Sequence, residues 1–434
     1  MSKPSFTGQL FDRIEWAGNI LNTPQEILEN ELKRFKYSEL TPDRIRVHMD
    51  DGSYESITAI AVLHYLPDPS KMPYKGGMRM SHTVTPDILR SLAVEMTLKC
   101  GVVELPFGGA KSGIVLPRPL PTYSEQEVSR IIEAVAEIFI RELKIIHPRY
   151  YVPATDIGTN AGHMDLIYNK FWDIYKTESA EGTPVTGVSV EYNGLPVRQI
   201  ATGMGGLTVL QYILEHGNVP KMPESPRVII QGVGQVGRSF FKLAEEAGYT
   251  IVGIANAVDA VYNANGIPYA SLPENSEDPF PNIPGNHVIP AQILEKPCDI
   301  LVPAAVENSL TAKNAADVDA SLILELANHP TTDEADDIFT ARKIPVIPDI
   351  LANAGGVTAS FQEWANSFGE ERHNIDVAEV DKKAKQKIIN ILQNNTEKVL
   401  FSASKYRTDL RGAAWIKAVN YLTRKILHKH KRWL

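Results

Sequence analysis

The chain has 434 residues, of which 43% are hydrophobic and 22% charged, a composition typical of soluble globular proteins. A chain of this length is expected to form about two or three domains. The formal net charge of −8 argues against nucleic acid or an anionic membrane as a partner of the whole surface. The two cysteines, Cys100 and Cys298, are too far apart for a zinc ribbon and too few for a disulfide scaffold.

The first residues do not resemble a secretory or transit signal, and no segment resembles a membrane span. Residues 1–16 contain acidic side chains and no continuous apolar core, and no apolar run in the chain approaches the roughly 18 residues that cross a bilayer. We therefore expect a cytoplasmic protein. The basic stretch 424–432 has no aromatic stacking platform, so we interpret it as a solvated helix end and expect no nucleic-acid partner. The histidines show no ligand spacing, so we predict no metal.

The first region begins with residues 26–36, which have a helical pattern. Residues 45–65 contain two strand-like stretches around an Asp-Asp-Gly turn. Thr85 followed by Pro86 predicts a helix start, and the apolar side chains of residues 88–96 then recur on one helical face. Ser124 with Glu127 forms a capping box and predicts another helix.

The second region alternates strand-like and helical patterns. Short runs rich in β-branched residues lie at 228–230, 250–255, 299–302, 322–326 and 345–347. Such alternation predicts a parallel sheet with covering helices. The last region is almost entirely helical in pattern. We predict an α/β protein with a substrate-binding and oligomerisation domain at 1–190, a Rossmann-type domain at 191–355, and C-terminal helices at 356–434 that return to the first domain.

A glycine-rich motif follows the first strand of the second region. Residues 232–237 read GVGQVG and directly precede a predicted helix, a context typical of dinucleotide binding because glycines let a pyrophosphate approach the helix N-terminus. The usual acid after the second strand is absent, and Asn256 stands near that position. Residues 254–269 contain no Lys or Arg to hold a 2′-phosphate. NAD or NADP is therefore expected, with NAD favoured.

Three lysines in the first region lie among small residues: Lys75, Lys99 and Lys111. Lys99 shares an apolar helical face with Leu92 and Met96, so its amine is desolvated, snorkels or faces an anion. Lys111 follows what we interpret as a small-residue loop, where burial would lower its pKa towards neutrality and suit acid–base work. Taken singly, a lysine is more often a solvated surface group.

A polar segment, residues 153–160, lies between a short strand and a predicted helix. Thr159 or Asn160 would cap that helix. Asp156 lies outside the capping role, and a carboxylate near an ammonium could act as a proton shuttle.

Several motifs, in one order along the chain, resemble the glutamate dehydrogenases of the Glu/Leu/Phe/Val dehydrogenase family. They are YKGGMR at 74–79, MTLKC at 96–100, LPFGGAKSG at 105–113, ATDIGTN at 154–160, ATG at 201–203, QGVGQVG at 231–237, LANHPTT at 326–332, IPDILANAGGV at 347–357 and LRGAA at 410–414. The resemblance covers most of the chain. It implies a homohexamer. We expect a cleft between the two domains, whose closure would exclude water from the hydride transfer.

The resemblance also implies a role for individual residues. Lys111 would activate water and polarise the reacting carbon, Asp156 would relay protons, and Lys99 would hold the substrate α-carboxylate. Lys75 and Ser360 would bind the side-chain carboxylate of glutamate. Ala154 would line the substrate pocket. The residues that would bind the cofactor are Thr202, Gly232, Gly234, Gln235, Val236, Gly237, Asn256, Asn328 and Asn353.

Four positions depart from the family pattern. They are Gln235 and Asn256, where the family usually has Asn and Asp, and Met204 and Thr155, where it has Arg and Pro or Gly. These departures affect cofactor choice more than the reaction, which we expect to be the reversible oxidative deamination of L-glutamate to 2-oxoglutarate and ammonia. Two alternatives stay open: a leucine- or phenylalanine-type dehydrogenase, and a catalytically silent regulatory paralogue.

Overall fold

The computed structural model describes residues 6–39, 45–65, 72–175, 182–368 and 376–430. The chain forms two compact units. Unit 1 consists of residues 1–196, 359–384 and 418–434, and unit 2 of residues 197–358 and 385–417. Residues 385–417, which the sequence places among helices returning to the first domain, thus cluster with unit 2.

Unit 1 is built on a sheet that has five strands in the described residues, in the order β1-β4-β6-β5-β7. Strands β5, β6 and β7 run parallel to one another, and β4 pairs antiparallel with β6. A separate β2–β3 hairpin encloses the Asp-Asp-Gly turn, as predicted. The strand bounds are β1 (Lys36–Glu39), β2 (Arg46–His48), β3 (Tyr54–Ser56), β4 (Thr58–Leu63), β5 (Tyr74–Ser81), β6 (Gly108–Val115) and β7 (Tyr151–Thr155).

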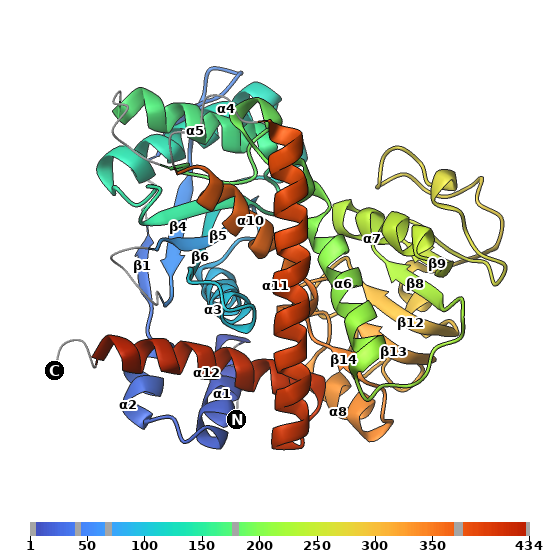
Figure 1. Cartoon of the computed structure of the whole chain (residues 1–434). Helices are drawn as coiled ribbons and strands as arrows, with labels where there is room; N and C mark the ends of the chain where they lie inside the picture. Colours follow the sequence, from blue (N-terminus) through green and yellow to red (C-terminus); the bar gives the residue numbers. More distant parts are fainter. Residues whose placement is uncertain (1–5, 40–44, 66–71, 176–181, 369–375, 431–434) are drawn as a thin grey trace. The chain divides into compact units, whose positions relative to one another are not determined.

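Helices cover both faces of the unit 1 sheet (Figure 1). Helix α3 (Pro86–Val102) packs on β6, with Leu89 and Ala93 against Ile60 and Val62 of β4. The other face is covered by α4 (Glu125–Glu137) and α5 (Ala161–Tyr175). The remaining helical segments that begin in unit 1 are α1 (Phe6–Ile20), α2 (Gln25–Ile27), η1 (Leu28–Leu32), η3 (Leu120–Thr122), η4 (Ile138–Glu142), η5 (Val190–Tyr192), η6 (Pro196–Gln199) and α11 (Val377–Tyr406).

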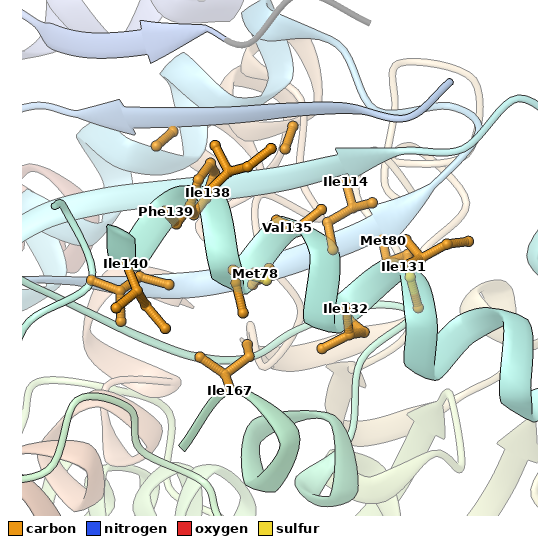
Figure 2. Packing of buried hydrophobic residues seen from close by; sticks show 14 of the residues in the cluster. Met78, Met80, Ile114, Ile131, Ile132, Val135, Ile138, Phe139, Ile140 and Ile167 are labelled. Carbon is orange, nitrogen blue, oxygen red and sulfur yellow. The ribbon is translucent and has the colours of Figure 1, made fainter. Parts of the chain in front are cut away.

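Helix α4 begins where its sequence predicts. Ser124 accepts from the Glu127 backbone N–H, and the Glu127 carboxylate accepts from the Ser124 backbone N–H, so both halves of the capping box are present. Figure 2 shows the apolar side of α4 facing the sheet, with Ile131 near Met80. Each such fully buried side chain contributes about 1.5–3 kcal/mol. The helix is therefore held by packing as well as by its cap.

Unit 2 contains a sheet of seven strands in the described residues, in the order β11-β10-β9-β8-β12-β13-β14. Strands β9, β8, β12, β13 and β14 are parallel, which confirms the predicted parallel sheet. Strands β10 and β11 add an antiparallel edge that the sequence patterns do not predict. The bounds are β8 (Arg227–Gln231), β9 (Thr250–Ala255), β10 (Ala260–Tyr262), β11 (Asn286–Val288), β12 (Cys298–Pro303), β13 (Ala320–Leu324) and β14 (Val346–Ile347).

Helices α6 and α7 pack against each other beside this sheet (Figure 1). The chain order β8, α7, β9 makes β8 the first strand, with its neighbours β9 and β12 on opposite sides. The helical bounds are α6 (Ala201–His216), α7 (Gln235–Glu246), η7 (Tyr269–Ser271), η8 (Pro290–Glu295), α8 (Asp333–Ala341), α9 (Asp349–Ala352), α10 (Gly355–Asn366) and α12 (Leu410–His430), of which α10 and α12 pass into unit 1.

A buried charge network links the start of α12 to the sheet of unit 2. The Arg411 guanidinium donates to both carboxylate oxygens of Glu325 (2.8 and 3.0 Å) and to Asp336. Glu325 is fully buried and also accepts from the Asp349 backbone N–H at 3.0 Å. Because a lone buried carboxylate would be costly, Arg411 is required for the Glu325 carboxylate to stay charged.

Several predicted elements differ in the structure. The predicted helix 26–36 ends at Leu32, and Lys36 already begins β1. Strands β5 and β6 are absent from the sequence prediction because their glycines and lysines obscure any alternation. The prediction that Lys111 follows a small-residue loop is therefore wrong, because Lys111 lies inside β6. The C-terminal region is helical, as predicted; the part of the basic stretch after residue 430 lies outside the described residues.

Two further observations concern membranes and thiols. In the part of the chain that the structure describes, no helix is both long and apolar enough to cross a membrane. Cys100 and Cys298 are free thiols, and both are buried.

Gly109 is predicted to be essential for packing α3 on β6. A Cβ at this position would lie 2.1 Å from Thr97 Oγ1 and 2.4 Å from Ala93 O. Because backbone cannot move aside cheaply, Gly109→Ala should lower the free energy of unfolding by about 3 kcal/mol. Gly162→Ala is the control, since its Cβ would come no closer than 3.4 Å to any atom outside its helix. Denaturant unfolding should show a large loss only for Gly109→Ala, and equal stabilities would contradict this packing.

Candidate functional site

One face of the unit 1 sheet collects charged side chains. Met78 and Met80 of β5 point to the apolar core under α4, so Lys75 and Arg79, an odd number of residues away, point to the opposite face. In β6 the same alternation places Ile114 under α4 and Lys111 on the opposite face. The charged side chains therefore emerge on the side that α3 covers.

Asp156 meets two of these cations just after β7. The Lys111 ammonium donates to Asp156 Oδ2, and Arg79 Nε donates to Asp156 Oδ1 at 2.9 Å. The neighbouring strand has Gly77 at this point, and a Cβ there would lie 2.6 Å from Asp156 Oδ2. The backbone N–H of Asp156 donates to Thr159 Oγ1, which itself donates to the Met78 carbonyl. The carboxylate is thus fixed in position by its backbone and by both cations.

The environment of this pair shifts both pKa values. Burial lowers the pKa of the Lys111 amine, and the Asp156 carboxylate only partly offsets that effect, while the Arg79 charge lowers it further. Burial would raise the pKa of the Asp156 carboxyl, but the charges of Lys111 and Arg79 outweigh it and hold that pKa at about 2. Asp156 is therefore an ionised acceptor beside an amine that releases its proton more easily than an exposed lysine.

The other sequence-predicted residues of unit 1 are also buried. Lys75 is 1% exposed and Lys99 6%, so neither amine is a solvated surface group. Ala154, in β7, pairs with Gly77 of β5, and Ser360 lies 3% exposed in the part of α10 that belongs to unit 1. The structure thus places all the predicted substrate and catalytic residues inside one unit.

Glu95 is a charged residue of this region that the sequence patterns do not single out. It lies one turn before Lys99 on α3, is 2% exposed, and places its carboxylate 4.0 Å from the Lys99 amine. Arg79 is the last residue of the motif at 74–79, but the sequence patterns assign it no role. Arg79 lies four residues after Lys75, and in a strand this even spacing places both side chains on one face. The spacing could have identified Arg79 only if residues 74–81 had been predicted as a strand.

The glycine loop, residues 232–237, fits a dinucleotide pyrophosphate. Gly232 has a φ of +104°, which allows the turn from β8 into α7. Gly234 is the N-cap of α7, and a Cβ built there meets no atom within 4 Å. A Cβ at Gly237 would lie 1.8 Å from Gly232 O, so only glycine permits this close turn. No side chain of the described residues caps α7, so its first N–H groups can bind phosphate oxygens.

Two predicted cofactor residues of unit 2, Asn328 and Asn353, contact each other, and a third, Thr202, lies against Gly356. Asn353 Nδ2 donates to Asn328 Oδ1 at 3.2 Å, and Gly356 approaches Thr202 so closely that a Cβ would lie 2.8 Å from its hydroxyl oxygen. Asn353 Oδ1 is buried and has no hydrogen-bond partner among the described residues. A buried acceptor of this kind suits a carboxamide such as that of nicotinamide.

Two predicted cofactor residues have side chains that already bond to the protein. Gln235 Nε2 donates to the Gln199 carbonyl at 3.0 Å. Asn256, directly after β9, donates from its amide to backbone carbonyls of residues 276 and 278. Val236, in the first turn of α7, completes the predicted set. In the described residues, no group of three His, Cys, Asp or Glu side chains could hold a metal ion.

A dinucleotide-type parallel sheet, together with a second α/β unit in which a buried lysine is bonded to an ionised aspartate, fits a nicotinamide-dependent dehydrogenase. Comparison with family models identifies the particular group. Residues 194–429 match the Glutamate/Leucine/Phenylalanine/Valine dehydrogenase model, and residues 40–172 match the Glu/Leu/Phe/Val dehydrogenase dimerisation domain. The chain belongs to the Glu/Leu/Phe/Val dehydrogenase family of amino acid dehydrogenases.

Individual relatives agree with this assignment. The catabolic NAD-specific glutamate dehydrogenase RocG of Bacillus subtilis is 31% identical, covering 94% of this chain and 95% of the relative. NAD-specific glutamate dehydrogenase A of Halobacterium salinarum is 34% identical, covering 83% and 80%. The leucine-bound hetero-hexameric glutamate dehydrogenase of Thermus thermophilus superposes with a TM-score of 0.84 at 26% identity, covering 98% of this chain and 97% of that one.

Replacing Gly234 by valine should block dinucleotide binding without unfolding the protein. The side chain would project into the space that the glycine loop leaves open and would keep a pyrophosphate from the N–H groups of α7. We expect the dissociation constant for NADH, measured by calorimetry, to rise at least about tenfold. The thermal midpoint should fall only slightly, because loss of a glycine cap costs about 1 kcal/mol or less. Unchanged affinity would show that the pyrophosphate binds elsewhere.

Proposed function

We propose that this chain is a glutamate dehydrogenase, which catalyses the reversible oxidative deamination of L-glutamate to 2-oxoglutarate and ammonia with NAD as the favoured coenzyme. The observation that carries the proposal is the set of cations on one sheet face, the buried Lys75 and Lys111 and the partly buried Arg79, together with the buried Lys99 of α3. A substrate with two carboxylates is complementary in charge to such a group of cations. The family relationship supports the same reaction.

Lys111 and Asp156 are proposed to perform the proton transfers. The lowered pKa of Lys111 lets its amine accept a proton from water that attacks the substrate imine. The ionised Asp156 carboxylate, bonded to that amine, relays protons to and from the substrate nitrogen. The bound nicotinamide supplies the acceptor for the hydride that leaves the amino acid Cα.

The remaining residues are proposed to bind and orient the two ligands. Lys99 holds the α-carboxylate, Lys75 and Ser360 hold the side-chain carboxylate, and Ala154 lines the pocket. The dinucleotide is assigned to the glycine loop and to the asparagine cluster near Thr202. Gly232, Gly234, Gln235, Val236 and Gly237 lie at the pyrophosphate end, with Asn256 on the adenosine side, and Asn328 and Asn353 lie at the nicotinamide end.

The comparisons also support the coenzyme and the assembly. The Bacillus and Halobacterium relatives are described as NAD-specific, which agrees with the absence of basic residues in 254–269. A hexamer is proposed from the hetero-hexameric Thermus protein and from the match to the family's dimerisation domain. A homohexamer in the cytoplasm is the simplest form of this proposal.

A spectrophotometric assay tests the proposal directly. The purified chain should oxidise NADH when both 2-oxoglutarate and ammonium are present, and should do so more slowly with NADPH. Activity only with branched-chain or aromatic 2-oxo acids would favour the alternative dehydrogenases of the family. Binding of NADH without turnover of any 2-oxo acid would identify a silent regulatory paralogue.

Lys75 is predicted to select the dicarboxylic substrate. Lys75→Leu should reduce kcat/KM for 2-oxoglutarate by about 30-fold or more, because loss of a buried charge pair costs about 2–5 kcal/mol. NADH affinity should not change. Lys242→Leu, at an exposed position of α7, is the control and should leave kcat/KM unaltered. If Lys75→Leu retained full activity with 2-oxoglutarate, Lys75 would not contact the substrate carboxylate.

Arg79 is predicted to set the pH dependence of the reaction. Its charge lowers the pKa of both Lys111 and Asp156, so Arg79→Gln raises both values. Glutamate oxidation increases as Lys111 loses its proton, and the acid limb of the kcat/KM profile should therefore move to higher pH in this variant. Arg79→Lys keeps the charge and should leave the limb near its original position. A limb that moves to lower pH in Arg79→Gln would contradict the assignment of Lys111 as the base.

A further inference from the structure

The loop of residues 273–280 is linked to the glycine loop through the side chain of Arg238. Arg238 follows the last glycine of that motif, and its Nε donates to Val233 O at 2.9 Å. The same guanidinium donates from Nη2 to Pro273 O at 2.5 Å. One side chain therefore holds the beginning of the 273–280 loop against the glycine loop.

Asn256 holds the middle of the 273–280 loop. Its Nδ2 donates to Ser276 O at 3.0 Å and to Asp278 O at 2.7 Å. Its Oδ1 accepts from the backbone N–H groups of Val258 and Asp259 at 3.0 and 2.8 Å. A side-chain amide has two N–H donors and two acceptor lone pairs. All four hydrogen-bonding positions of Asn256 are thus used within the protein.

Asp259 holds the end of the 273–280 loop. Its Oδ2 accepts from the Phe280 backbone N–H at 2.8 Å, and the Phe280 side chain is 1% exposed. The loop is therefore attached at its beginning, middle and end, although it contains no helix or strand.

This attachment explains an unusual residue choice. In dinucleotide-binding folds an acid after the second strand usually accepts from the ribose 2′-OH. An aspartate at position 256 has no N–H to donate, and it would face the carbonyl oxygens of Ser276 and Asp278. Asparagine is thus the residue that can hold this loop, and its occupied amide leaves no acceptor for the ribose.

The 273–280 loop lies near the expected position of the adenosine ribose, whose 2′ substituent is the difference between NAD and NADP. In this fold the adenosine ribose binds between the glycine loop and the end of the second strand. The 273–280 loop is linked to the glycine loop through Arg238 and is bonded to Asn256, directly after the second strand. The loop contains Glu274, Glu277 and Asp278 and no Lys or Arg. All three carboxylates are exposed, so a 2′-phosphate brought to this position would meet negative charge.

We propose that Asn256 is a positioning residue that holds the 273–280 loop beside the adenosine ribose, and that the carboxylates of this loop make the protein select NAD over NADP. The proposal deepens the proposed function, since it rests on the use of a nicotinamide dinucleotide. It assigns coenzyme choice to a loop about 20 residues beyond the strand end at which the choice is usually made.

The first test is Asn256→Asp, with Asn263→Asp as the matched control. Asn263 makes the same kind of bonds in the next turn, to Pro284 O and from the Asn265 N–H, but none to the 273–280 loop. In Asn256→Asp we expect NADH affinity, measured by calorimetry without substrate, to fall about tenfold. Hydrogen exchange of residues 273–280 should accelerate in the same variant. Asn263→Asp should change neither. Unchanged or tighter NADH binding by Asn256→Asp would overturn the proposal.

The second test exchanges charge on the loop. The double variant Glu274→Lys with Glu277→Lys should raise NADPH affinity relative to NADH by about tenfold or more. Glu246→Lys, on an exposed position of α7 outside the loop, controls for the general change in surface charge. An equal change of the NADPH to NADH ratio in the loop and control variants would show that the loop does not select the coenzyme.

The outcomes distinguish this proposal from the proposed function. Both tests measure dinucleotide affinity without a 2-oxo acid. A chain that bound NADH as described but failed to turn over glutamate would contradict the proposed function alone. A chain that turned over glutamate while both variants behaved like their controls would contradict the loop assignment alone.

Discussion

The unit 1 site depends on keeping cationic side chains away from water on one face of a sheet. Transfer of an ammonium group from water into protein is costly unless an anion compensates it. Asp156 compensates Lys111 and Arg79, and Glu95 lies close to Lys99. This arrangement explains why glycines line the strands: Gly77 leaves room for the Asp156 carboxylate, and Gly109 lets α3 approach β6.

The two units meet the needs of their ligands in different ways. Unit 1 uses side-chain charge, which is strong where it is desolvated and can be shifted by its neighbours. Unit 2 offers uncapped backbone N–H groups at the start of α7 and amide side chains such as that of Asn353, and these groups do not change their charge with pH. We therefore propose that proton transfer takes place in unit 1, and that unit 2 binds the coenzyme with groups whose charge does not change with pH.

Local signals in the sequence predicted much of the fold. The capping residues Thr85 and Ser124 marked α3 and α4, and the glycine motif marked the turn between β8 and α7. Strands β5 and β6 escaped prediction because the charges and glycines that make the site remove the usual alternation. The contacts of Asp156 were therefore out of reach, since they depend on strand pairing. Helical periodicity in residues 385–417 likewise carries no information on which unit they join.

The network around Arg411 has a consequence for the order in which the chain can fold. Glu325 precedes its charge partner Arg411 by 86 residues in the sequence. During synthesis on the ribosome, the sheet of unit 2 emerges well before the arginine that neutralises its buried carboxylate. Completion of this unit is consequently a late event, and a fragment ending at residue 358 would keep Glu325 without its counter-ion.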